Sequence, residues 1–327
     1  MPNSPPYQRR RFGMLAKVES IYGTDAVPTV GANGVRLLDA FEPNTAPAFP
    51  NIREAAATGT LGRAKSAIPR GNMASLAFVA ELRGTRAGTA YAANNLPPLS
   101  PILQACGYKE TGSYGGGVET VTYTPDETGA FKSCTVYYYW GNKFYAVTGC
   151  RGTGRLVCTP GQLVRFEGTL QGMLAVETEL DLPSITSYGT AEALAAVGLT
   201  LAIGAFSPDR YEELTLDLGA DVVRADSGNA TDGIAAFDIA GFDPRLTLRT
   251  RVVDLGDYDP YADALARTLR AISYTIGGTQ YAKLEVDLPN AEVQEPGLAE
   301  QSRFAGYSLE YRLPWEPGDT LPTLTFE

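Results

Sequence analysis

The chain is patterned mostly as short alternations of apolar and polar residues separated by glycine and proline. This period-two alternation predicts β-strands, because successive side chains of a strand point to opposite faces. Tyr137, Tyr138 and Tyr139 stand in series, so both faces of their strand carry an aromatic ring and neither is expected to be freely solvated. In the first half, the pattern predicts a strand or one helical turn over residues 14–21 and strands over 34–40, 73–82, 120–123, 134–140, 143–148, 154–158 and 162–170.

The second half repeats this order of elements, with a helix in the same place. Each helix begins near a proline, a residue favoured at the first helical position, and the second has Asp259 as its N-cap. A hairpin over 271–288, turning at Gly277–Gly278, and a last strand over 300–313 follow. The corresponding pairs are strands 34–40 and 213–223, segments 62–68 and 232–239, strands 73–82 and 245–255, and helices 97–106 and 259–269.

One stretch supports the repeat at the level of individual residues. Residues 141–170 and 278–309 both contain a glycine turn, an aromatic-rich strand, a Pro-Gly turn and the sequence Arg-Phe-x-Gly. Because the elements recur in the same order with matching turn chemistry, we predict two related units. The matching residues are Pro160–Gly161 with Pro296–Gly297, and Arg165–Gly168 with Arg303–Gly306.

Two units fit the length of 327 residues, since a typical domain has roughly 100–200 residues. We predict two tandem domains, over 14–180 and 199–327, preceded by an N-terminal arm over 1–13 and joined by a linker over 181–198. Residues 41–70 form a long loop rich in proline, alanine and glycine within the first domain. A compact domain seldom holds such a loop without a use for it, so we expect the loop to contact another molecule.

Composition agrees with this fold class and argues against several functions. The 35 glycines, 22 prolines and 18 tyrosines are typical of short strands joined by turns, so the fold is expected to be mainly β with short flanking helices (α+β). The net charge is −10, and only residues 8–11 form a basic run, so no phosphate-neutralising nucleic-acid site is expected. No apolar run is long enough for a signal peptide or a membrane span, so no membrane contact is expected.

Residue types that carry catalysis or bind metals are scarce. The chain has no histidine, which removes Ser/His/Asp and Cys/His triads and histidine-ligated metals. Four cysteines without paired spacing are expected to be reduced thiols packed among strands: Cys106, Cys134, Cys150 and Cys158. The glycine-rich segments 115–117 and 149–154 do not match a phosphate-binding loop, so they are interpreted as turns.

Carboxylates are abundant and fall into two groups. These are Glu177, Glu179 and Asp181 along one expected strand, and Asp254, Asp257, Asp259 and Asp263 around a helix start. Two suitably separated acids are enough for a glycosidase, but a helix start attracts aspartate for capping and dipole reasons. We therefore predict no catalytic residue, no cofactor and no metal site, and we interpret the chain as a structural protein and not an enzyme.

A set of short sequences in the first half forms a family signature. Residues 144–153 are a strand leading into a G-x-R-G-T turn, followed by Pro160–Gly161 and Arg165–Gly168. Residues 14–29 (MLAKVESIYGTDAVPT) and 99–111 (LSPILQACGYKET), ahead of Tyr-Thr-Pro, belong to the same set. With these segments, which cover most of residues 10–175, the chain resembles the tail tube (major tail) proteins of long-tailed bacteriophages.

The resemblance implies a fold and an assembly. Each unit would be a tail-tube-like β-sandwich or half-barrel with a flanking helix, and sheets would join side by side into a ring around a lumen. Rings would stack through the loop at 41–70 and the arm at 1–13. Because many tube proteins with one unit form hexamers, two units imply a homotrimer with pseudo-sixfold symmetry. The second unit departs from the signature, since residues 287–290 (DLPN) stand where G-x-R-G would fall.

The resemblance also implies partners and a location. The chain would assemble with copies of itself, enclose the tape measure protein and meet tail terminator and distal tail proteins. It would belong to the virion tail, be assembled in the host bacterial cytoplasm and form a non-contractile tail through which DNA is ejected without specific binding. Acids that line the lumen would repel DNA phosphates, and the candidates are Glu177, Glu179, Asp181, Glu213 and Asp217.

The residues are compatible with two other functions. Tyrosine-rich strands also suit a carbohydrate-binding or adhesin β-sandwich module of a phage tail tip. The abundant acids leave a carboxylate-based hydrolase open, although no particular pair of acids favours it.

Overall fold

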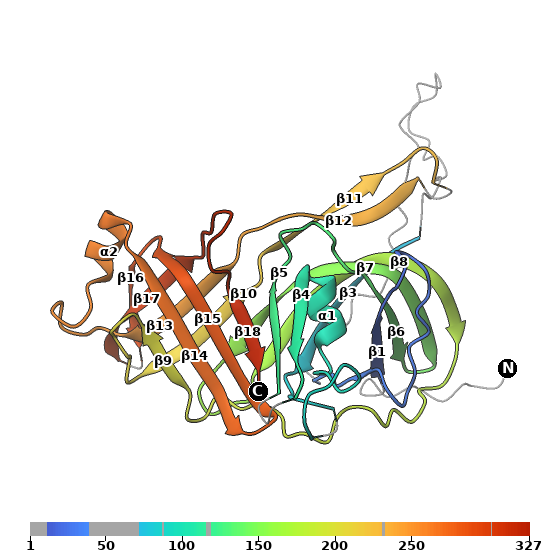
Figure 1. Cartoon of the computed structure of the whole chain (residues 1–327), viewed down its shortest axis with the longest axis horizontal. Helices are drawn as coiled ribbons and strands as arrows, with labels where there is room; N and C mark the ends of the chain where they lie inside the picture. The colour runs from blue at the N-terminus through green and yellow to red at the C-terminus, as the bar shows by residue number, and fades with distance from the viewer. Residues whose placement is uncertain (1–11, 39–71, 87, 116–118, 231–232, 302) are drawn as a thin grey trace, which may run out of the picture.

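The computed structural model describes residues 12–38, 72–86, 88–115, 119–230, 233–301 and 303–327. Strands dominate this part of the chain, and short helices lie beside the sheets (Figure 1). The predicted mainly β fold is therefore confirmed. The predicted loop at 41–70, the segment at 62–68 and most of the arm at 1–13 lie outside the described residues.

The elements of the first half follow the predicted order closely. The helix and the strand at Cys134–Trp140 were expected, whereas β4 was missed. In chain order the elements are β1 (Phe12–Val18), β2 (Gly34–Val35), β3 (Met73–Glu81), α1 (Ser100–Ala105), β4 (Tyr108–Ser113), β5 (Thr120–Pro125), β6 (Cys134–Trp140), β7 (Lys143–Cys158) and β8 (Arg165–Glu179).

The second half contains more strands than the sequence pattern predicted. Two of the missed strands, β9 and β18, have four residues each, too few for a clear alternation. The elements are β9 (Thr200–Ile203), β10 (Tyr211–Asp217), β11 (Ala220–Asp226), β12 (Ile234–Phe242), β13 (Arg245–Arg251), α2 (Pro260–Ala266), β14 (Leu269–Thr279), β15 (Ala282–Val293), β16 (Gly297–Gln301), β17 (Phe304–Arg312) and β18 (Thr323–Phe326).

Strands pair in the same order in the two halves, and every pair among the described residues is antiparallel. The first half has the order β1-β6-β7-β8-β3, and the second has β9-β14-β15-β17-β13. Beyond β3, Leu37 bridges to Ala80, and beyond β13 lies β10. The pairing order is thus an independent observation in favour of a repeated unit.

The two halves share one sheet. Strand β10 pairs with β7, and the C-terminal β18 is placed between β15 and β5, so the sheet crosses between the halves twice. One apolar core extends through both halves, and a smaller cluster surrounds Leu15 and Phe144. Tyr138 lies in the large core and Tyr139 in the small one, which confirms that neither face of β6 is freely solvated.

The linker at 181–198 runs along the first half without forming a helix. Arg83 donates a hydrogen bond of 2.6 Å to the carbonyl oxygen of Ala191. Arg86 donates to the carbonyl oxygens of Gly34 and Ser187, at 2.7 and 2.8 Å. Both arginines are partly buried, and their hydrogen bonds fix the path of the linker from the end of β8 to β9.

Three predicted turns are wrong. The G-x-R-G-T segment is not a turn between two strands, because β7 runs through it with a register shift between Thr148 and Arg151. Gly149 at that shift has φ of +63°, so the glycine makes a bulge instead of a chain reversal. Likewise Gly277 lies within β14, and the hairpin closes between Thr279 and Ala282. The third is at Pro296–Gly297, where the chain continues from β15 into β16 along β17.

The two Arg-Phe-x-Gly sequences both begin a strand, but they are not equivalent in space. Phe166 in β8 is fully buried, whereas Phe304 in β17 is 58% exposed. In β17 the large buried side chains are those of Tyr307, Leu309 and Tyr311, each an odd number of residues after Phe304, so Phe304 points to the opposite face. The two phenylalanines that match in sequence therefore lie on opposite faces of their strands, so the sequence match is one residue out of step with the inward-facing positions. A single strand predicted over 213–223 is also wrong, because Gly219 turns the chain between β10 and β11.

Candidate assembly interface

The seam between β7 and β10 joins the two halves through backbone pairing and apolar side chains. Strand β6 accompanies only the first part of β7, and β10 takes its place beside Arg155–Cys158. Leu156 pairs with Phe166 on one side and with Leu216 on the other. Leu156 is 1% exposed, so the added strand completes a continuous apolar row. A sheet edge that would otherwise be open is thereby closed.

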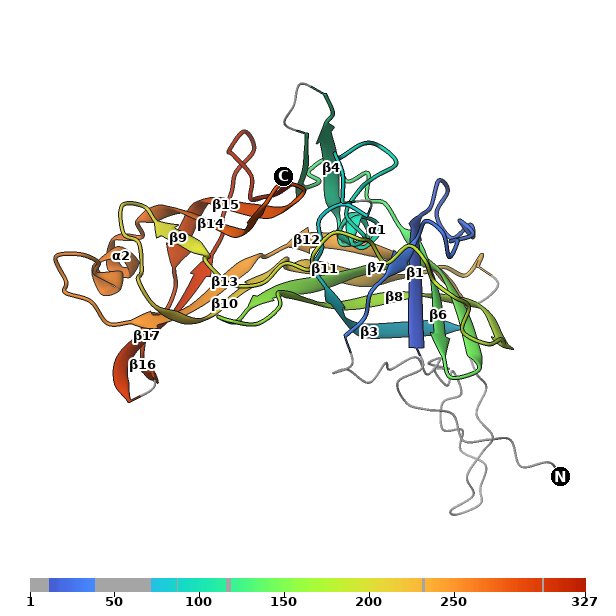
Figure 2. The ribbon, with the colours of Figure 1, turned by 90° about the horizontal axis from the view of Figure 1, so that it is seen from below.

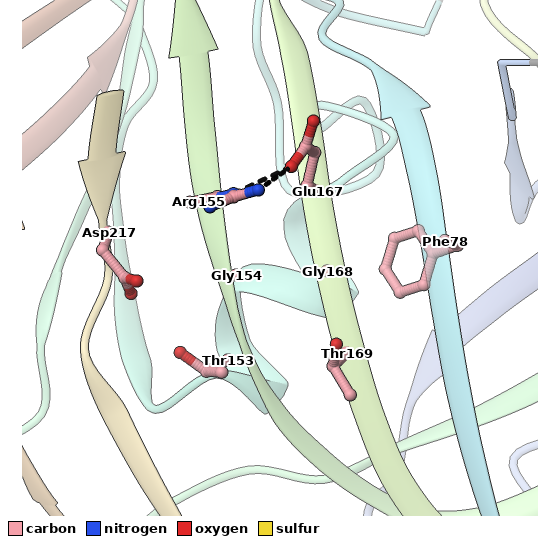
Figure 3. Close-up of a pocket in the computed structure, with 8 residues that line it drawn as sticks. All are labelled: Phe78, Thr153, Gly154, Arg155, Glu167, Gly168, Thr169 and Asp217. Carbon is pink, nitrogen blue, oxygen red and sulfur yellow. Dashed lines mark hydrogen bonds and ion pairs between the residues drawn. The ribbon is translucent and has the colours of Figure 1, made fainter. Parts of the chain in front are cut away.

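The other face of the seam is polar. Arg155 forms an ion pair of 2.7 Å with Glu167, and Asp217 stands opposite Arg155 in the neighbouring strand. Figure 3 shows these side chains around a shallow pocket, with Thr153 and Thr169 below them. Phe78 is the aromatic residue of the lining and is 3% exposed, so the pocket lacks an open ring on which a sugar could stack.

The second half also contacts the first through the β11–β12 hairpin, which extends over β7 and β8 in Figure 1. Arg151 of the G-x-R-G-T sequence donates to the carbonyl oxygens of Phe237 and Phe131, at 2.8 and 2.9 Å, and pairs with Asp238. Its side chain is only 11% exposed. Charged hydrogen bonds in such an enclosed place are stronger than neutral ones, so Arg151 ties the hairpin to β7.

Tyr22 lies between Arg151 and the hairpin. The guanidinium carbon of Arg151 lies 4.9 Å from the centre of the Tyr22 ring. The hydroxyl oxygen of Tyr22 accepts a 2.8 Å hydrogen bond from the Phe237 amide. Burial raises the pKa of Tyr22, so its phenol is neutral at pH 7. A side chain at Gly149 would meet the Tyr22 ring at 2.9 Å, which explains why glycine stands beside the arginine.

Glu19 stabilises this arrangement through hydrogen bonds to its carboxylate. The carboxylate is 4% exposed and accepts hydrogen bonds from the amides of Gly149 and Gly23, each 2.8 Å. The hydroxyls of Thr135 and Ser133 donate the other two, at 2.8 and 2.6 Å. A buried carboxylate with four donors is well satisfied, so Glu19 fixes the bulge of β7 to the chain that carries Tyr22.

The five predicted lumen acids lie in two separate places. Glu177 and Glu179 are on the exposed end of β8, with Asp181 just beyond it, and Glu179 pairs with Lys143 at 3.4 Å. Glu213 and Asp217 are on β10. Glu213 stands 3.8 Å from Arg249, and Asp217 accepts a hydrogen bond from the Gly219 amide. The structure does not bring the two groups together in one chain, and their place relative to a lumen stays a prediction.

The remaining residues that carry chemistry have structural roles. Asp259 caps α2, and Asp263 is buried in a two-bonded pair with Arg270. The four cysteines are buried free thiols, and burial raises the pKa of Cys158 to about 12. Within the described ranges, no group of histidine, cysteine, aspartate or glutamate side chains could hold a metal ion. In the same ranges, no helix combines the length and the apolar character that a bilayer crossing requires.

Sequence reasoning found Arg151 but not its partners. Glu19 and Tyr22 stood in the segment that supported the resemblance, yet nothing local assigned them a role. Leu216 and Phe237 come from a part of the chain that is distant in sequence. Knowledge of which strands pair between the halves would have been needed to identify Leu216 and Phe237.

Comparison with known proteins agrees with this architecture. A family model described as phage tail tube protein matches residues 10–315, which includes both halves and the seam. No curated protein matches the chain in a sequence search.

Proposed function

Because the chain belongs to the family of phage tail tube proteins, whose role is structural, we propose that it polymerises as stacked rings into the tube of a phage tail. The observation that carries this proposal is the β7–β10 seam, where the sheet of one half continues into the other. A repeated side-by-side joint of this kind closes into a ring when its rotation allows.

The ring is proposed to be a homotrimer with pseudo-sixfold symmetry. The common pairing order of the two halves supports this stoichiometry, since three chains would then supply six similar units. The two domains at 14–180 and 199–327 are proposed as these units, although their shared sheet makes them dependent on each other.

The loop at 41–70 and the arm at 1–13 are proposed to form the contacts between stacked rings. Deleting residues 41–70 is expected to leave a folded protein that forms rings but no tubes. Circular dichroism and electron microscopy would measure the two properties. Tubes of normal length from the deleted protein would assign the stacking contact elsewhere.

In the virion tail, the tube is proposed to enclose the tape measure protein and to end at tail terminator and distal tail proteins. Assembly would take place in the host bacterial cytoplasm, and the tail would be non-contractile. The net charge of −10 suits a wall that conducts DNA without binding it. Glu177, Glu179, Asp181, Glu213 and Asp217 are the acids proposed to line the lumen.

Electron microscopy of the purified chain tests the proposal directly. Three-fold rings or hollow tubes are the expected result at high protein concentration. A persistent compact monomer would contradict it. Saturable binding to one sugar on a glycan array would favour the carbohydrate-binding module instead.

A further inference from the structure

Strand β16 occupies the place in the second half that the end of β7 occupies in the first. Each is the last stretch before a hairpin turn and pairs with the strand that follows, β17 or β8. The end of β7 also has β10 on its outer side. Strand β16 pairs with β17 alone among the described residues, and Figure 2 shows it at the end of the molecule, beyond β17.

The backbone of β16 is oriented to accept another strand. The Val252 amide donates to the Ala305 carbonyl oxygen at 3.2 Å, so the backbone groups of Ala305 face β13. Glu300 stands opposite Ala305 and Leu298 opposite Tyr307. Because Ala305, and with it Tyr307 two residues on, directs its backbone groups toward β13, the pairs Glu300–Ala305 and Leu298–Tyr307 are the pairs without hydrogen bonds between β16 and β17. The amides of Leu298 and Glu300 therefore point away from β17, toward the outer edge of β16.

The side chains at this edge repeat the chemistry of the seam without its cover. Leu298 stands beside Tyr307 as Leu156 stands beside Phe166. Leu156 is shielded by Leu216 and is 1% exposed, whereas Leu298 is 73% exposed. On the other face of the hairpin, Phe304 is also exposed, with the Arg251 guanidinium 4.3 Å from its ring. An open edge strand with an exposed apolar side chain is a site for strand addition.

We infer that the outer edge of β16 is where a second copy of this chain adds a strand. The occupant is a copy because the chain already makes such a joint between its own halves, and the joint uses two different elements, β7 and β10. The contact between copies is correspondingly heterologous, with β16 of one copy meeting a different sheet edge of the next. This inference rests on the proposed function and identifies the edge that the ring would use.

Two substitutions test the edge in the full-length protein. Leu298→Asp places a charge in the joint, and Glu300→Pro removes an outward amide, a change that edge strands tolerate. Each is expected to raise the protein concentration needed for assembly roughly tenfold or more, which is the effect of about 1.4 kcal/mol. Val197→Asp, at another exposed aliphatic position (66% exposed), is the control and is expected to assemble normally. Analytical ultracentrifugation measures assembly, and thermal unfolding of each monomer checks the fold.

The outcomes separate this inference from the proposed function. Normal assembly of both folded variants would overturn the β16 edge and leave the tube role standing. A wild-type chain that never assembles would overturn both. Leu298→Cys adds a test of the heterologous arrangement, because two identical edges would bring the new thiols together. Assembled Leu298→Cys protein is expected to form no disulfide-linked dimers on oxidation, and abundant dimers would overturn the heterologous joint.

Discussion

Gly149 combines three constraints that no other residue type meets together. Its φ of +63° lies in the left-handed region, its amide donates to the buried Glu19, and its α-carbon faces the Tyr22 ring. The sequence identified a glycine-rich signature here but could not give the reason for it. The reason lies in side chains more than a hundred positions earlier, whose approach depends on the fold.

Replacing Gly149 by alanine is expected to destabilise the protein by more than the left-handed conformation alone costs, which is about 1–2 kcal/mol. The added methyl group would also displace Tyr22, because it would stand 2.9 Å from the ring. Gly129→Ala is the matched control, since Gly129 has φ of +72° and open space around it. Urea unfolding measures both, and equal losses in the two variants would contradict the role of Tyr22.

At the scale of elements, the sequence predicted a boundary correctly where the residues that determine it are neighbours in the chain. The β6 boundaries and the Asp259 cap of α2 agree with the sequence pattern, since each depends on neighbouring residues. Glycine was misread at Gly149 and Gly277, because a bulge inside a strand and a turn between strands require the same positive φ. The actual reversal after β14 uses Tyr281, a non-glycine residue with φ of +64°, which no turn rule favours.

The docking of the β11–β12 hairpin is expected to depend on Arg151. Arg151→Ala removes charged hydrogen bonds to Phe237 and Asp238, each contributing about 1.5–3 kcal/mol in comparable settings. Hydrogen exchange of the β12 amides should accelerate at least about tenfold, while the β6 amides stay protected. Arg224→Ala is the control, because Arg224 forms an exposed pair with Asp226 within the hairpin itself and reaches the first half through a long 4.0 Å contact to the Met73 sulfur. Unchanged exchange in Arg151→Ala would show that the hairpin is held by other contacts.

The organisation of the whole molecule was predictable only in part. The sequence pattern predicts two related halves because their elements recur in order. It did not reveal that β7 pairs with β10, or that β18 is placed between β5 and β15, since these strands carry no local mark of their distant partners. In the resulting continuous sheet, strands of each half cover sheet edges of the other half. Two independent tandem domains would each cover their own edges.

A shared sheet predicts that the halves unfold together, and the two tryptophans allow this to be measured. Trp140 lies in β6 of the first half, and Trp315 follows β17 in the second. In the dissociated chain, Trp140→Phe and Trp315→Phe each leave one probe, and both proteins are expected to give coincident midpoints by fluorescence and circular dichroism.

A cavity in the seam sharpens this test. Leu216→Ala should lower the stability reported by both probes equally, by about 2–5 kcal/mol, because Leu216 is buried between Leu156 and Leu246. Leu265→Ala, at a leucine that is 91% exposed on α2, should change either midpoint by less than about 0.5 kcal/mol. If Leu216→Ala shifted only the Trp315 signal, the halves would be thermodynamically separate, and the seam would be a contact between domains instead of a shared sheet.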